Sequence, residues 1–131
     1  MSKIFTTLAA LITASACAAA AQTSEPYQTS AYEPPAATEC VIDASRTRHG
    51  MRFEARAHAF QPVSGEYEFV LTKRDAGGSS DIVQGGAFAI AAGDGEVLGG
   101  AELSLERGAH YRARLVLWGA DGEICRDERR S

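Results

Sequence analysis

Apolar and polar residues alternate along most of the chain after residue 38. The clearest case is Met51 to Phe60, "MRFEARAHAF", where one set of alternate positions is apolar and the other is mostly charged. Successive side chains of a β-strand point to opposite faces. We therefore expect a strand that buries Phe53, Ala55, Ala57 and Ala59. Its solvent face would then carry Arg52, Glu54, Arg56 and His58.

Six further segments show the same period of two, with turn signals about every ten residues. The predicted strands span 39–45, 51–60, 66–74, 81–91, 96–106, 110–118 and 123–127. Gly85-Gly86 inside the fourth segment predicts a bulge or a bend there. No segment after the N-terminal leader has the 3.6-residue apolar spacing of a helix. The pattern predicts an all-β fold, a seven-stranded immunoglobulin-like antiparallel β-sandwich.

The first 21 residues differ from the rest of the chain. Lys3 is their only charge, an apolar run follows it, and the segment ends in three alanines before Gln22. This pattern is typical of a cleaved signal peptide, which we expect over residues 1–21. The apolar run is too short and too rich in Ala, Thr and Ser for a membrane span, so we expect none. "TASAC", which ends at Cys17, distantly matches a lipobox, and lipid attachment there is the alternative.

Residues 22–37, "QTSEPYQTSAYEPPAA", contain three of the four prolines and lack Val, Ile, Leu, Met and Phe. Such a segment cannot bury a core face, so we expect a disordered tether. The β-sandwich domain would then occupy residues 38–131.

Two cysteines remain after leader cleavage, Cys40 and Cys125, near the two ends of the folded segment. In an oxidising compartment they are expected to form a disulfide that ties the termini together. A reactive thiol pair is the alternative, although the two cysteines lack the C-x-x-C spacing typical of such pairs.

The charge balance and the motifs exclude several classes of function. The chain has a net charge of −4, and loss of Lys3 with the leader would make it −5, which disfavours nucleic-acid binding. His49, His58 and His110 lack metal-ligand spacing, so no metal and no cofactor are expected. No G-x-S-x-G, P-loop or G-x-G-x-x-G motif occurs, and nothing else indicates an enzyme.

Paired arginines are the remaining candidate feature. Arg52 and Arg56 repeat on one predicted strand face, and Arg112 and Arg114 repeat on another. Each pair would form a compact cationic patch that attracts anionic groups. The alternative is an ordinary solvated face on which Glu54, Glu66 and Glu68 are cross-strand partners of these arginines.

The chain as a whole resembles a known family. "ECVIDASRTRHGMRFEARAHAF", "SGEYEFVLTKRDAGGSSDI" and "ARLVLWGADGEICRDE", together with the leader and the tether, look like CsgH, the alphaproteobacterial member of the CsgC-like curli chaperones. The resemblance covers the folded segment and rests on no single motif. Enterobacterial relatives carry a C-x-C pair, which this sequence lacks, and this puts an oxidoreductase role in doubt.

The resemblance implies an ATP-independent periplasmic chaperone that prevents premature amyloid formation by the curli subunit. The partner would be the unfolded curli subunit, and a monomeric chaperone is expected. Arg52, Arg56, Arg112 and Arg114 are the candidate client-binding residues for charge-guided contact, and pairing at a strand edge is the other mode. A generic envelope interaction module and a thiol-disulfide exchange protein are the alternative functions.

Overall fold

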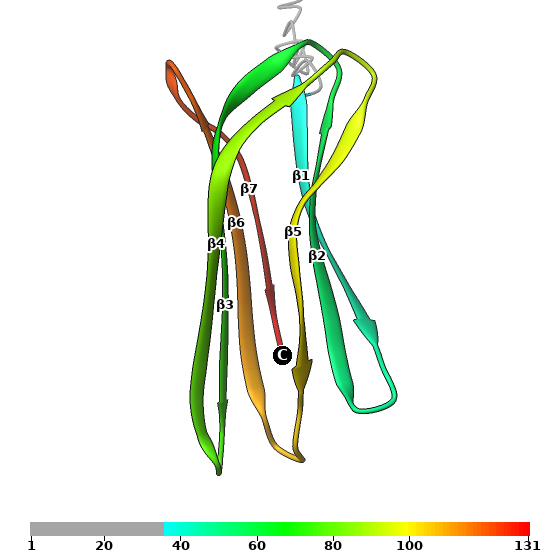
Figure 1. Ribbon diagram of the computed structural model, residues 1–131, viewed down its shortest axis with the longest axis vertical. Coiled ribbons are helices and arrows are strands. Elements are labelled where there is room, and N and C mark those ends of the chain that lie inside the picture. Colours follow the sequence, from blue (N-terminus) through cyan, green and yellow to red (C-terminus); the bar gives the residue numbers. More distant parts are fainter. Residues whose placement is uncertain (1–35) are drawn as a thin grey trace, which may run out of the picture. The chain divides into compact units, whose positions relative to one another are not determined.

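The computed structural model describes residues 36–131, which form seven β-strands (Figure 1). The strands are β1 Thr38–Arg46, β2 Gly50–Ala59, β3 Val63–Asp75, β4 Gly78–Ile90, β5 Gly95–Ser104, β6 His110–Gly119 and β7 Gly122–Arg130. Each predicted strand is found, with ends that shift by a few residues. The predicted signal peptide, Cys17 and nearly all of the predicted tether lie outside the described residues.

The strands form two antiparallel sheets that pack face to face, which confirms the predicted all-β sandwich. The three-stranded sheet has the order β1-β2-β5, and the four-stranded sheet has the order β4-β3-β6-β7. Figure 1 views the sandwich from its side, with β4 and β3 to the left and β5 and β2 to the right. In constant-type immunoglobulin domains the fourth strand shares a sheet with the first, second and fifth strands. Here β4 pairs with β3 instead and becomes an edge of the four-stranded sheet.

The core lies between the sheets and is built from the predicted alternation. The apolar set of β2 is buried, with Phe53, Ala55 and Ala59 fully covered. Phe69 and Leu71 of β3 and Leu115 and Leu117 of β6 are likewise buried. The ring of Phe53 meets the ring of Tyr111 edge-on across the sandwich, with centroids 4.9 Å apart. Small alanines opposite large side chains allow this close fit of the two layers.

Of the bulge or bend predicted at Gly85-Gly86, the bulge is absent. The β3 and β4 strands keep one register from Val63/Ile90 to Asp75/Gly78. Register shifts lie instead between β2 and β5, where Leu98 is the extra residue, and between β6 and β7, at Ile124. Gly85 lies close to β3, since a Cβ there would lie 3.0 Å from the main-chain oxygen of Tyr67 and would need a small shift.

The edge strands β1 and β7 face each other along one side of the sandwich, which we call the β1/β7 seam. The predicted Cys40–Cys125 disulfide is present and lies in this seam, 85 residues apart in sequence. It was expected only to tie the termini, but it also joins the two sheets, because β1 and β7 belong to different sheets. The main-chain N–H of Ile42 donates to Asp127 at 2.7 Å, and its carbonyl accepts from Arg129 at 3.1 Å.

The edge strands β4 and β5 face each other along the other side, the β4/β5 seam. The side-chain amide of Gln84 donates to the carbonyl of Gly100 and accepts from its N–H, both at 2.9 Å. A Cβ on Gly99 would lie 2.6 Å from the Gln84 amide oxygen, and one on Gly100 would lie 2.7 Å from the carbonyl of Phe53. Gly99 therefore makes room for the Gln84 clamp, and Gly100 makes room for the main chain of β2.

Candidate functional site

The structure separates the four candidate arginines into two pairs. Arg52 and Arg56 lie on β2 and point outward from the three-stranded sheet. Arg112 and Arg114 lie on β6 and point outward from the four-stranded sheet. Because the outer faces of a sandwich point in opposite directions, the pairs form two separate patches. A single surface containing all four side chains does not exist.

Each arginine of the three-stranded sheet contacts acidic neighbours. Arg52 pairs with Glu102 of β5 at 3.1 Å. Arg56 lies between Asp43 of β1, at 3.0 Å, and Glu54 of its own strand, at 2.8 Å. The hydrogen bond and the charge of Glu54 raise the pKa of Arg56 above its ordinary value. This patch is therefore a mixed row of cations and anions.

The four-stranded sheet repeats the arrangement. Arg112 pairs with Glu128 of β7 at 2.7 Å, and Arg114 pairs with Glu68 of β3 at 3.1 Å. Glu128 also contacts Arg130 of its own strand. Hydrogen bonds from Arg112 and then Arg130 hold the pKa of the Glu128 carboxyl below its usual value. Of the acids expected as partners, Glu54 and Glu68 are used.

These ion pairs are weakly held. The side chains of Arg52, Arg56, Arg112 and Arg114 remain 59%, 48%, 56% and 46% exposed. Ion pairs between exposed side chains typically contribute about 0–1 kcal/mol, because water and salt screen them. Each arginine can therefore exchange its internal carboxylate for one on a partner at small cost. The arrangement permits charge-guided contact without requiring it.

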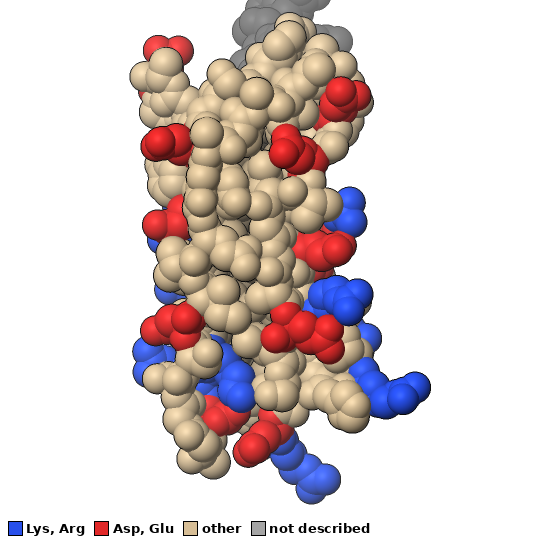
Figure 2. All heavy atoms as spheres, viewed as in Figure 1, with Lys and Arg blue, Asp and Glu red and all other residues tan. Residues whose placement is uncertain are grey.

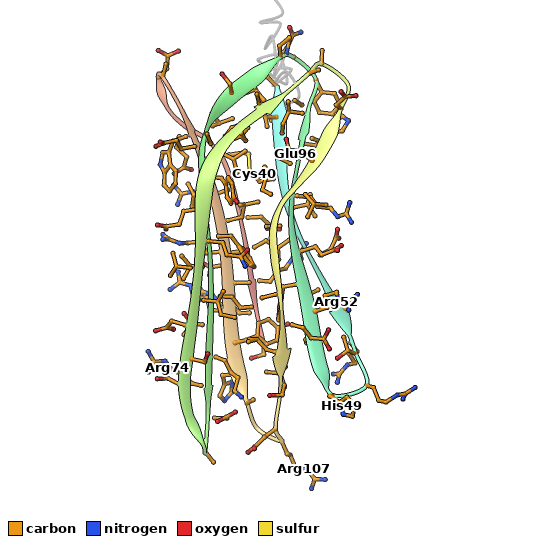
Figure 3. All side chains as sticks on the ribbon, in the orientation of Figure 1. Cys40, His49, Arg52, Arg74, Glu96 and Arg107 are labelled. Carbon is orange, nitrogen blue, oxygen red and sulfur yellow. A yellow bond between two sulfur atoms is a disulfide. The ribbon has the colours of Figure 1, made fainter. Side chains whose placement is uncertain are left out.

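The structure also reveals a basic end that strand-by-strand reading missed. Alternate turns of an up-and-down chain lie at the same end of a sandwich. The β1–β2 turn, the β5–β6 turn and the C-terminal end of β3 therefore lie at one end. They carry Arg46, Arg48, His49, Arg74 and Arg107, which we call the basic end. Figure 3 shows the labelled members His49, Arg74 and Arg107 toward this end and Glu96 toward the other. Among the described residues, none of these four arginines forms an ion pair in the structure.

The opposite end is acidic. Its turns and strand ends carry Glu39, Glu66, Asp94, Glu96 and Asp121. In the face shown in Figure 2 the upper end carries only acidic colour, and basic side chains gather toward the lower end. The turn sequences "SRTRHG" and "LERGAH" against "AAGDGE" and "GADGE" contain this signal. The difference in charge between the two ends is visible in the sequence only when alternate turns are compared.

No group of three or more His, Cys, Asp or Glu residues within 36–131 is arranged to hold a metal ion. Over the same residues the structure contains no helix suited to crossing a membrane.

Comparison with known proteins identifies the family. Residues 39–129, nearly the whole described segment, match the family described as "CsgH protein". The chain belongs to the CsgH family. No curated protein matches the sequence.

Two solved structures share the fold of this CsgH-family chain. The solution structure of CsgH from R. palustris is 23% identical, covers 70% of this chain and 89% of its own, and gives a TM-score of 0.57. The E. coli curli protein CsgC is 10% identical, covers 71% of this chain and 96% of its own, and gives a TM-score of 0.59. At these identities the likeness shows a shared sandwich fold.

Proposed function

We propose that this CsgH-family protein is a periplasmic accessory of curli assembly. It would hold the curli amyloid subunit in an unpolymerised state through transient binding, without ATP, a cofactor or a catalytic step. The observation that carries the proposal is the family match over residues 39–129. The fold shared with a protein described as a curli protein supports it, and the Cys40–Cys125 disulfide fits an oxidising compartment.

The charged surfaces suggest how binding would begin. Opposite charge at the two ends creates a field that orients an approaching chain, and such steering weakens as salt rises. The pairs Arg52/Arg56 and Arg112/Arg114 would then contact acidic groups of the client by exchanging weak internal partners. Because the pairs lie on opposite faces, each would act independently of the other.

Fibrillation of a curli-type subunit, followed by thioflavin fluorescence, tests the proposed function. The full chain as isolated from cells should lengthen the lag phase at substoichiometric amounts. An unchanged lag phase would overturn the proposal.

Charge reversal separates the role of the arginines from that of the fold. We expect the double variants Arg52→Glu/Arg56→Glu and Arg112→Glu/Arg114→Glu each to extend the lag phase less than the wild type does. The loss of lag extension in the fourfold variant should equal the sum of the losses in the two double variants. Arg126→Glu is the control for a change of charge alone, since Arg126 is 70% exposed, pairs with Glu123 and belongs to neither arginine pair, although it lies on β7 beside Arg112 and Arg114. Full inhibition by a folded fourfold variant would exclude charge-guided binding through these residues.

A further inference from the structure

The outer edge of β4 has an open main chain. The β3–β4 hairpin closes over two residues, so Asp75 and Gly78 exchange both ladder hydrogen bonds, and bonding to β3 then alternates along β4. Since β4 has no other neighbour in its sheet, every second residue directs its N–H and C=O away from the protein. These positions are Ser79, Asp81, Val83, Gly85 and Ala87, which we call the β4 edge.

The β4 edge is uncovered. Within residues 36–131 no side chain and no other main-chain group bonds to the N–H or C=O of its five residues. All five residues are exposed, and Val83 is 65% exposed. Unpaired strand edges of this kind accept a further strand unless the protein blocks them.

Each of the other three edge strands carries features that hinder pairing. On β1, Asp127 and Arg129 occupy the N–H and C=O of Ile42. On β5, Gln84 occupies those of Gly100, and the bulge at Leu98 interrupts the edge. On β7 the outward positions carry the charged residues Arg126, Glu128 and Arg130, and a register shift occurs at Ile124. Charges and bulges are the usual devices against edge pairing.

The β4 edge has a single charge and no bulge. β4 is 13 residues long, keeps one register with β3 throughout, and has Asp81 as its only charged residue. Gly85, Gly86 and Ala87 leave the main chain uncovered by side chains. In Figure 2, which looks onto the β4/β5 side, the upper part of this strip is uncharged, with acidic side chains on both flanks.

We propose that the β4 edge binds an extended, low-charge segment of an unfolded polypeptide by strand addition. This inference rests on the proposed function and names where the amyloid-competent client binds. A low-charge edge suits low-charge segments, because a charged segment would lose hydration without gaining a partner. Gly and Ser along β4 specify register weakly, which suits many client segments better than one fixed pairing with a second copy of this chain. A client strand held there would have one of its own edges covered and unavailable for stacking.

Val83→Pro tests the edge directly. The N–H of Val83 points away from β3, so proline removes no ladder bond but blocks an added strand. Val83→Ala is the matched control, because it removes the same apolar side chain and keeps the N–H. We expect the proline variant to need about tenfold more protein for the same lag extension, and the alanine variant to match the wild type.

Amide hydrogen exchange of the wild-type chain gives an independent reading that needs no variant. With excess client, the open amides of the β4 edge should become protected, while those of Arg126, Glu128 and Arg130 should not. Full inhibition by folded Val83→Pro, or unchanged exchange along β4 in an inhibiting sample, would overturn the edge proposal and leave the proposed function standing. Protection that appears without client and rises with protein concentration would show self-pairing and also overturn it. Absence of inhibition by the wild type would instead contradict the proposed function itself.

Discussion

The two seams of the sandwich join the two sheets through different contacts. In the β1/β7 seam a disulfide and two charged side chains join the sheets. In the β4/β5 seam the neutral amide of Gln84 bonds both main-chain groups of Gly100. In each seam, side chains of the four-stranded sheet thus bond to main-chain groups of the three-stranded sheet, at Ile42 of β1 and at Gly100 of β5. Only the β4/β5 seam leaves the facing strand of the four-stranded sheet uncovered and with a single charge, Asp81.

The two seams therefore differ in their contribution to fold stability and in the accessibility of their main chain. The β1/β7 seam is locked covalently and protected by charges, so it stabilises the fold and resists edge pairing. The β4/β5 seam fastens β4 through its inward side chains and leaves its outward main chain open. Under the proposed function the protein would meet amyloid-competent chains without aggregating, and it would benefit from limiting accessible backbone to one defined strand.

The largest expected effect comes from breaking the covalent seam. Cys40→Ala/Cys125→Ala should lower the free energy of unfolding by about 4 kcal/mol, because the disulfide closes a loop of 85 residues. Denaturant unfolding of the variant and the wild type measures the loss. If the two unfold at the same denaturant concentration, the β1/β7 seam is not the stronger of the two.

The next effect comes from the Gln84 clamp. Gln84→Ala leaves the N–H and C=O of Gly100 without their protein partner, and we expect a loss of about 1–2 kcal/mol. Asp127→Ala is the counterpart in the other seam, where it frees the N–H of Ile42. Denaturant unfolding compares them, and a loss for Gln84→Ala larger than that for the disulfide variant would reverse the ranking of the seams.

A smaller effect is expected from Gly99→Ala, at about 1 kcal/mol. Its Cβ would lie 2.6 Å from the Gln84 amide oxygen and push the clamp from Gly100. In a Gln84→Ala background the same change should therefore cost almost nothing, which a double-mutant cycle measures. Additive losses would mean that Gly99 is needed for another reason, such as the nearby ring of Phe69.

The sequence was enough to predict the seven strands, the buried face of β2 and the disulfide. These features follow from the period of two, from turn residues and from the presence of two cysteines in the domain. The sheet to which each strand belongs does not follow from that period, because alternation distinguishes the two faces of a strand and not its neighbours. The strand pattern therefore did not show that Arg56 and Arg114 lie on opposite faces of the sandwich.

The same limit explains the misplaced bulge and the missed edge. Gly85-Gly86 has the composition of a bulge, yet Gly85 lies in regular pairing close to the Tyr67 carbonyl, and an extra residue falls at Leu98. The open edge of β4 depends on its pairing with β3 rather than β5, a tertiary choice that local pattern does not encode.

The smallest expected effect concerns the hairpin that starts the open strand. The Asp75 carboxylate contacts Lys73 at 2.6 Å and accepts from the N–H of Gly77 at 2.9 Å, and the bond to Lys73 is the main reason that the pKa of Asp75 lies below its ordinary value. A carboxyl with a lowered folded-state pKa stabilises the fold above its unfolded pKa of about 4, and this contribution is lost as pH falls through the folded pKa. The Tm of the wild type should therefore exceed that of Asp75→Asn slightly at pH 7, and the gap should close toward pH 2. Thermal unfolding at both pH values measures the gap. A gap that is equal at the two values would show that the charge of Asp75 does not hold the β3–β4 hairpin.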